Sequence, residues 1–354
     1  MAKDIRSLTA LRGIAALMVL GYHSANLLFG GFEHVPPPMS HGNLAVDLFF
    51  LLSGFILMHV HQREFADGVR WANVKSFLRA RFARTYPVHL AVLLVLVPLY
   101  SARPNAGLGF VHSLLLTQGV WLDAPTWNVP AWSISAEWHA YLLFPFLVMP
   151  WQGRSLRVVG AVLLLCVATV GVLAMTADGN VGTIYYGPAV LLRVLPEFIA
   201  GMGIYRVYQN GLLRSRLSGD AALAIAATAV IALALFNGTD IAVIAALAVV
   251  LLACAHNQGI ASRVLTHRVP MYLGRISYSL YMVQTVAAEA ALRIVHPSPA
   301  EYFGGSATLA GAMFLSSFAI AVPLSRYIEY PVRDLLRGRV STYAGRHLPT
   351  GSSR

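Results

Sequence analysis

The sequence predicts an all-α protein, a polytopic transmembrane helix bundle of about ten spans. Of its residues, 57% are hydrophobic and only 12% are charged, and its mean hydropathy is +0.64. This composition is too apolar for a soluble domain. The apolar residues gather in ten runs, most of which approach the roughly 20 residues needed to cross hydrocarbon. These runs cover about 11–28, 44–60, 85–102, 132–150, 156–176, 184–206, 219–236, 240–256, 271–294 and 306–330.

The positive charge indicates how the spans are oriented. The net charge is +11, but the basic residues are sorted between apolar runs, which is typical of a topology signal and not of a nucleic-acid footprint. A cytoplasmic N-terminus and ten crossings place every Lys and Arg except Arg103, Arg193 and Arg293 on the cytoplasmic side. We therefore expect both termini to be cytoplasmic, the lipid bilayer to be a partner, and nucleic acid not to be one.

Two segments lie outside the ten runs, a short apolar one at 108–121 and a polar one at the C-terminal end. The run at 108–121 is shorter than a span, and counting it as a crossing would send later Arg-rich loops outside, so we interpret it as re-entrant or interfacial. An ordinary eleventh crossing is the alternative. Residues 1–337 form one transmembrane domain in this interpretation, and 338–354 form a polar, disordered tail.

Two ionisable residues lie in the first apolar run. Arg12 and His23 are eleven positions apart, which in a helix places them on one face, about 16 Å from each other. Ionisable groups are costly inside a membrane and usually have a function there. A cation and a titratable imidazole on one stripe make this the strongest candidate site.

Two carboxylates are expected at about the depth of His23. Asp47 lies near the outer end of the second run and Glu137 lies more than one turn into the fourth. Asp47 has an alternative role as a helix N-terminal residue favoured by the macrodipole. Glu137 is buried in apolar sequence and therefore needs a partner.

Other intramembrane polar residues have simpler interpretations. Ser53 and Gly54 form a small pair that favours close helix packing, and a serine nucleophile would need an adjacent base. Arg193 and Glu197 are four residues apart, so we interpret them as an ion pair within one helix.

The most basic loop contains Arg81 and Arg84. Their spacing places two guanidinium groups side by side on a helix that we expect to end before Pro87. Such a pair is suited to phosphate or pyrophosphate, although topology alone also explains basic residues here. Arg275 could extend the same site or simply flank a helix.

Cys166 and Cys254 are not at a metal-ligand spacing and are expected at different depths, so no metal site or disulfide is predicted.

Taken together, the motifs resemble those of the acyltransferase-3 family of integral membrane acyltransferases, which includes exopolysaccharide and O-antigen acetylases. The resemblance covers nearly the whole chain, and its elements occur in order: LTALRGIAALMVLGYH, VDLFFLLSGFIL, RARFARTYP, WSISAEWHAYLLFP, LPEFIAGM, LGRISYSLYMVQ and YIEYP. Gln284 departs from the pattern, because many members have His there.

The resemblance implies transfer of an acyl group, such as acetyl, from cytoplasmic acyl-CoA to a hydroxyl of a sugar in an envelope or exported glycan or glycolipid. It implies that His23 is catalytic and that Glu137 matches a family glutamate. Arg12 matches the family arginine, and Arg81 and Arg84 match the pair associated with CoA. No permanently bound cofactor is expected.

The chemistry expected at His23 is general base catalysis, since a near-neutral imidazole can accept the hydroxyl proton and return it to the thiolate. Asp47 or Glu137 would orient the ring, and an acyl-histidine intermediate is a less favoured variant. The alternative functions are a carrier or flippase for a lipid-linked sugar and a structural scaffold for exopolysaccharide assembly.

Overall fold

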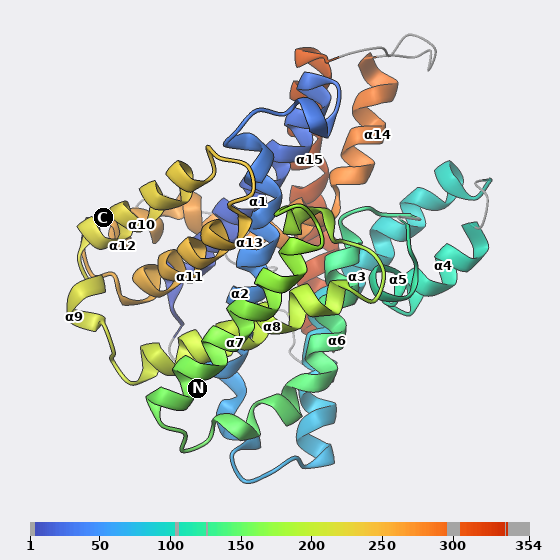
Figure 1. Cartoon of the computed structure of the whole chain (residues 1–354). Coiled ribbons are helices and arrows are strands. Elements are labelled where there is room, and N and C mark those ends of the chain that lie inside the picture. Colours follow the sequence, from blue (N-terminus) through green and yellow to red (C-terminus); the bar gives the residue numbers. More distant parts are fainter. Residues whose placement is uncertain (1–3, 103–105, 125–126, 296–304, 337, 339–354) are drawn as a thin grey trace, which may run out of the picture.

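The computed structural model describes residues 4–102, 106–124, 127–295, 305–336 and 338, and all regular secondary structure in these ranges is helical (Figure 1). The predicted all-α class is therefore confirmed. The tail expected at 338–354 lies outside the described residues, except for Gly338. The longer helices are α1 (Arg6–Phe29), α2 (Ala45–His61), α3 (Trp71–Tyr100), α6 (Ala131–Leu147), α7 (Leu156–Met175), α8 (Val190–Gln209), α10 (Asp220–Leu233), α11 (Asp240–His256), α13 (Arg268–Met282), α14 (Gln284–Val295) and α15 (Ala307–Leu324).

Short helices connect them. The α-helices are α4 (Ala106–Leu114), α5 (Gln118–Trp121), α9 (Arg214–Leu217), α12 (Ile260–Leu265) and α16 (Tyr330–Leu336). The 3₁₀ segments are η1 (Phe32–His34), η2 (Met39–Leu44), η3 (Gln62–Phe65), η4 (Met149–Trp151) and η5 (Val181–Thr183), and η7 (Ser325–Glu329) is a π-helix. The interval expected to be re-entrant or interfacial forms α4 and α5, two helices that are each too short to cross a membrane.

Every predicted apolar run contains a helix, but ten spans are not confirmed. Among the described residues, five helical segments are long and apolar enough to cross a membrane. These are Arg6–Phe29, Met39–Phe65, Trp71–Tyr100, Leu156–Met175 and Ala307–Leu336. Two further apolar helices, α10 and α11, are shorter. Of the remaining runs, the one at 271–294 is divided at Val283 into α13 and α14, whereas α6 and α8 are continuous. The helix α8 carries the charged residues Arg193, Glu197 and Arg206.

Glycine contacts bring the central helices together. Gly54 of α2 lies against the backbone of Phe198 in α8, and Gly201 of α8 lies against the backbone of Leu51, so a Cβ at either glycine would overlap main-chain atoms. Gly274 of α13 packs in the same way on Thr9 of α1. The interpretation of Ser53 and Gly54 as a close-packing pair is thus confirmed for the glycine.

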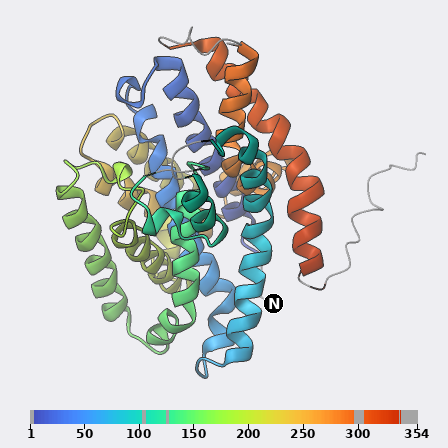
Figure 2. The ribbon, with the colours of Figure 1, turned by 90° about the vertical axis from the view of Figure 1, so that its right-hand side faces the viewer.

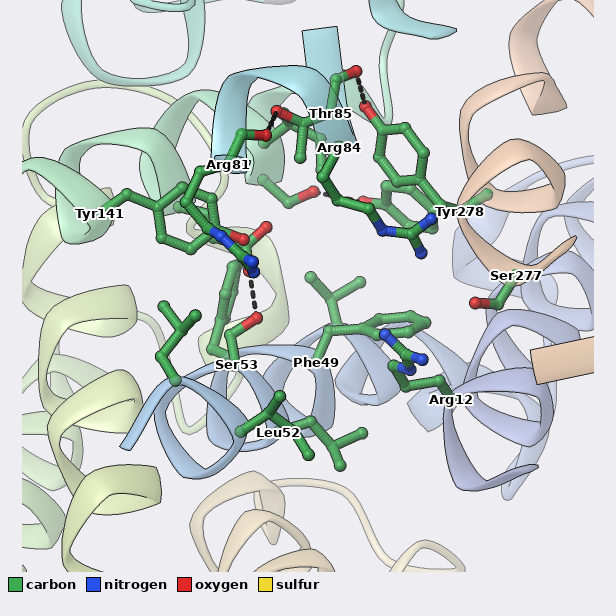
Figure 3. A pocket seen from close by; sticks show the side chains of 18 residues that line it. Arg12, Phe49, Leu52, Ser53, Arg81, Arg84, Thr85, Tyr141, Ser277 and Tyr278 are labelled. Carbon is green, nitrogen blue, oxygen red and sulfur yellow. Dashed lines mark hydrogen bonds between the residues drawn. The ribbon is translucent and has the colours of Figure 1, made fainter. Parts of the chain in front are cut away.

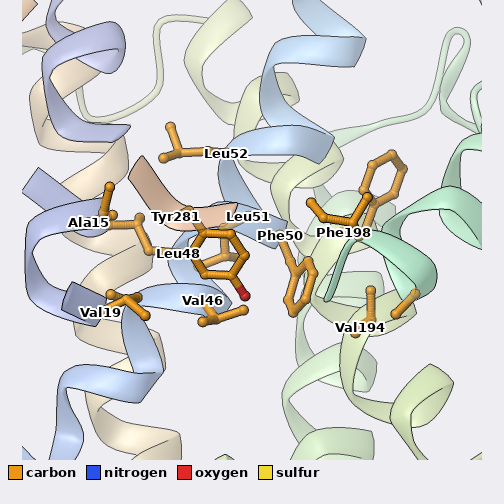
Figure 4. Packing of buried hydrophobic residues seen from close by; sticks show 14 of the residues in the cluster. Ala15, Val19, Val46, Leu48, Phe50, Leu51, Leu52, Val194, Phe198 and Tyr281 are labelled. Atoms are coloured by element: carbon orange, nitrogen blue, oxygen red, sulfur yellow. The ribbon is translucent and has the colours of Figure 1, made fainter. Parts of the chain in front are cut away.

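These contacts produce a continuous apolar core in the middle of the bundle. Ala15 and Val19 of α1, Leu48 of α2, Phe198 of α8 and Tyr281 of α13 pack together there (Figure 4). The helices α7 and α15 lie on opposite sides of this core (Figure 2). Side chains of these helices therefore fill much of the centre of the bundle.

The helix that carries the basic pair is longer than expected. The prediction that it ends before Pro87 is wrong, because α3 is continuous to Tyr100 with Pro87 and Pro98 inside it. Proline is tolerated in membrane helices where neighbouring groups satisfy the freed backbone carbonyls. Close to Pro87, the Tyr278 hydroxyl donates a 2.5 Å hydrogen bond to the carbonyl of Thr85, which ties α3 to α13. Because α3 is continuous through Pro87, Arg81 and Arg84 belong to the same helix as its apolar part.

Candidate active site

Five helices surround a cavity of about 120 Å³, which we call the arginine chamber (Figure 3). Its basic lining consists of Arg12 from α1 and of Arg81 and Arg84 from α3, whose guanidinium groups point into the same space. Three cations around one cavity confirm that the first helix and the basic loop converge. The other lining residues are Val46, Phe49, Phe50, Leu52, Ser53, Ile56, Leu57, Thr85, Ser133, Ile134, Glu137, Tyr141, Ser277, Tyr278 and Tyr281.

The arginines differ in their partners. Arg84 forms an ion pair with Glu329 of η7, and its guanidinium lies 5.6 Å from the centre of the Tyr278 ring. Glu329 is 1% exposed, and it also accepts a 2.6 Å hydrogen bond from Ser279. Arg81 has no carboxylate at ion-pair distance among the described residues, and its Nε is buried without a hydrogen-bond partner there. Arg81 is therefore more available than Arg84 to an added anion.

Glu137 belongs to the arginine chamber. Its carboxylate accepts a hydrogen bond from the Ser53 hydroxyl, which joins α6 to α2. No sequence pattern indicates this pair, because the two residues are 84 positions apart. The predicted need of Glu137 for a partner is met by Ser53.

His23 lies in a second cavity of about 110 Å³, the histidine chamber. Its wall is rich in aromatic rings and contains one amide, that of Asn43 in η2. The Tyr22 ring stacks on Phe32 with ring centres 4.7 Å apart. The complete lining is Val19, Tyr22, His23, Phe32, Asn43, Val46, Val129, Pro130, Trp132, Gly182, Tyr185, Arg193 and Tyr281.

The partner of His23 is Gln284, at the start of α14. The histidine Nδ1 is hydrogen-bonded to the amide oxygen of Gln284. Since that oxygen can only accept, Nδ1 carries the proton and Nε2 retains a lone pair. The Gln284 side chain is 1% exposed, and its amide nitrogen has no partner among the described residues. The ring is thus oriented by a neutral amide.

The expected contact of Asp47 with His23 is replaced by a different one. Asp47 accepts two 2.8 Å hydrogen bonds from Arg193, and the side chains are 0% and 1% exposed. Arg193 also donates to the carbonyl of Ile184 at 2.9 Å. The ion pair predicted between Arg193 and Glu197 is therefore wrong as well, because the guanidinium is directed from α8 toward α2.

Two residues, Val46 of α2 and Tyr281 of α13, line both chambers. They therefore form the boundary between the space that contains the arginines and the space that contains His23. Arg12 and His23, on the same helix α1, each contribute to one side of this boundary.

The last sequence candidate, Arg275, is placed differently from the other arginines. It is exposed, it is not part of the arginine chamber lining, and its guanidinium lies 5.9 Å from the centre of the Tyr272 ring.

The signal that could have identified Gln284 was its polarity within an apolar run. Glu329 and Tyr281 had no individual signal in the sequence and occur there only as members of the motifs YIEYP and LGRISYSLYMVQ.

Comparison with known proteins agrees with the family resemblance of the motifs. Residues 5–326 match the acyltransferase domain family. The chain is 30% identical to the acyltransferase MdmB of Streptomyces mycarofaciens, over 94% of this chain and 92% of that protein. It is 29% identical to the exopolysaccharide production protein ExoZ of Rhizobium meliloti, over 88% of this chain and 96% of that protein.

A more limited similarity, 26% identity over 40% of this chain and 24% of the relative, links it to the peptidoglycan O-acetyltransferase OatA of Listeria monocytogenes. No solved structure matches the chain significantly. The family match and the coverage of MdmB extend over nearly all of the helices that form the two chambers. The chain belongs to the acyltransferase-3 family and is an integral membrane acyltransferase.

Proposed function

We propose that this acyltransferase moves an acyl group, in the simplest case acetyl, from acyl-CoA to a hydroxyl of a sugar in an envelope or exported glycan or glycolipid. One observation carries the proposal: an arginine-lined chamber and a histidine chamber meet at Val46 and Tyr281. The names of the relatives ExoZ and OatA, which refer to exopolysaccharide and peptidoglycan, support a glycan acceptor. The enzyme would lie in the inner membrane with both termini in the cytoplasm.

The donor is proposed to enter from the cytoplasmic side. The phosphates of CoA are strongly anionic and cannot enter hydrocarbon, whereas Arg12, Arg81 and Arg84 offer several guanidinium donors. The thin pantetheine arm would continue along α1 and bring the thioester past Val46 and Tyr281 to His23. The acceptor would reach the histidine chamber from the other side, where aromatic rings and the amide of Asn43 suit the apolar faces and hydroxyls of a sugar.

His23 would act as the general base. Its Nε2 accepts the proton of the acceptor hydroxyl while the oxygen attacks the thioester carbonyl. The tetrahedral intermediate then collapses, the carbon–sulfur bond breaks, and the imidazolium returns the proton to the thiolate. Gln284 would hold Nδ1 during this cycle, in place of the carboxylate expected from the sequence.

The direct experiment is incubation of the purified protein with acetyl-CoA labelled in the acetyl group and with cell-envelope glycans. We expect label to appear in the glycan with release of one CoA for each group transferred. Movement of unmodified glycan without a covalent product would instead favour the carrier hypothesis, for which the enzyme family offers no support. Label that remains in acetyl-CoA under all conditions would contradict the proposed donor.

The arginine chamber predicts a selective effect on the donor. Arg81→Ala removes a guanidinium without breaking an ion pair of the described structure, so we expect the KM for acetyl-CoA to rise by about tenfold or more while the KM for the acceptor stays the same. Arg79→Ala is the matched control, since Arg79 is exposed on the same helix and contacts the carbonyl of Leu336. An equal KM for acetyl-CoA in both variants would remove Arg81 from the donor site.

The contact of Gln284 with His23 predicts an effect on turnover. Gln284→Leu removes the acceptor for Nδ1, and we expect kcat to fall by about tenfold, the equivalent of one hydrogen bond, with little change in either KM. Gln284→Glu retains an acceptor oxygen and should recover part of the lost kcat. Turnover that is equal in Gln284→Leu and the wild type would show that the amide has no positioning role.

A further inference from the structure

The boundary between the chambers consists of two side chains that the proposed reaction does not otherwise use. Val46 and Tyr281 are each 5% exposed, and both line the arginine chamber and the histidine chamber. Figure 4 shows the Tyr281 ring next to Val46 of α2. On the proposed donor route, the acyl group moves past these side chains and then lies beside them.

The Tyr281 ring is held in place at several points. Its hydroxyl donates a 3.0 Å hydrogen bond to the carbonyl of Pro130, and it lies 2.8 Å from the Ser133 hydroxyl. Its ring packs edge-on against Phe49 with ring centres 5.8 Å apart. The following residue, Met282, accepts a 3.0 Å hydrogen bond from the buried amide of Asn128, so the end of α13 is fastened to the same segment. One side of the boundary is therefore fixed.

The Val46 side is fixed as well. Its neighbour Asp47 forms the two 2.8 Å hydrogen bonds with Arg193 that join α2 to α8. Valine is branched at Cβ, and in a helix it strongly prefers one χ1 rotamer. Two fixed side chains bound the space beside the histidine chamber, and this space cannot enlarge without breaking these contacts.

We propose that Val46 and Tyr281 determine the length of the acyl chain that the enzyme transfers. This inference rests on the proposed function, in which the acyl group at the end of the pantetheine arm has to cross the boundary so that its carbonyl carbon reaches His23. The acyl carbons beyond the carbonyl then occupy the space that Val46 and Tyr281 border, and acetyl needs the least of it. Longer acyl chains must also share the histidine chamber, of about 110 Å³, with the acceptor.

The expected selectivity follows from the size of a methylene group. A pocket that is too small or too large by one methylene typically discriminates by about 10- to 200-fold in kcat/KM. We expect the wild type to prefer acetyl-CoA to propionyl-CoA and propionyl-CoA to butyryl-CoA. Val46→Ala removes two methyl groups from the boundary and should raise the butyryl to acetyl ratio of kcat/KM by about tenfold or more.

The test measures transfer from labelled acetyl-, propionyl- and butyryl-CoA to cell-envelope glycans in the full-length protein. The ratio of kcat/KM values within one preparation does not depend on the fraction of folded protein. Val159→Ala is the matched control, because Val159 is a valine of α7 that is 1% exposed and lines neither chamber. Its ratio should equal that of the wild type.

Two further variants keep the proposal open to refutation if Val46→Ala does not fold. Val46→Ile adds one methylene and should lower the butyryl to acetyl ratio, whereas Tyr281→Phe keeps the ring but removes its hydroxyl anchor and should raise it. Ratios within about twofold of the wild type in all boundary variants would overturn the inference while leaving the proposed function intact. A wild type that transfers none of the three acyl groups would instead contradict the proposed function.

Discussion

Replacement of His23 by alanine is expected to lower acyl transfer by on the order of 10²- to 10⁴-fold, the usual contribution of a positioned general base. His23 is the imidazole that lines the histidine chamber, and its bond to Gln284 leaves Nε2 free to accept a proton. The loss should appear in kcat with saturating acetyl-CoA, measured as label transferred to envelope glycans.

The same variant should remain folded and bind the donor. His23 is partly exposed to its chamber, and the arginines lie in the other chamber, so equilibrium binding of labelled acetyl-CoA should be close to that of the wild type. His139→Ala is a suitable control, because His139 contacts Trp121 and the Ser135 carbonyl and lines neither chamber. Full transfer activity in His23→Ala would refute the general-base role.

The second large effect is expected at the buried ion pair. Arg193→Met should reduce the free energy of unfolding by about 3–5 kcal/mol, because Asp47 would remain as an unpaired charge in an apolar interior. Asp47→Leu should cost a similar amount, since it leaves Arg193 without its carboxylate. Thermal unfolding in detergent measures both, and Arg326→Met, at an exposed arginine, should change stability little.

The double variant Asp47→Leu with Arg193→Met separates structure from catalysis. Replacing both charges by apolar groups removes the uncompensated charge, so we expect stability to return close to the wild-type value. If the pair only anchors α2 to α8, acyl transfer should return with it. A double variant that is stable but inactive would show that Asp47 or Arg193 also acts in the reaction.

The features predicted well from the sequence depend on one helix at a time. Helical periodicity was sufficient to place Arg12 and His23 on a common stripe, and both line chambers in the structure. The spacing of Arg81 and Arg84 was sufficient to bring their guanidinium groups together. Hydropathy was sufficient for the all-α class.

The features predicted poorly depend on how two helices are rotated against each other. The depths of Asp47 and Glu137 could be counted along the sequence, but the directions in which they point could not. The packing of Gly54 on Phe198 helps to fix the face that α2 presents to α8, where Asp47 meets Arg193. No single-helix pattern contains this information.

The ten spans predicted from hydropathy are not confirmed, for a related reason. Hydropathy reports how apolar a run is, but not whether a buried polar contact interrupts the helix within it. The break at Val283 lies beside Gln284, which binds His23. Here the polar residue that completes the site and the interruption of the helix occur at the same place.

The contact between His23 and Gln284 joins residues that are 261 positions apart. The Arg84–Glu329 pair similarly spans 245 positions. Because the ribosome delivers the N-terminal helices first, α1 and α3 must enter the membrane long before the partners of His23 and Arg84 have been synthesised. The contacts of His23 with Gln284 and of Arg84 with Glu329 can therefore form only near the end of translation.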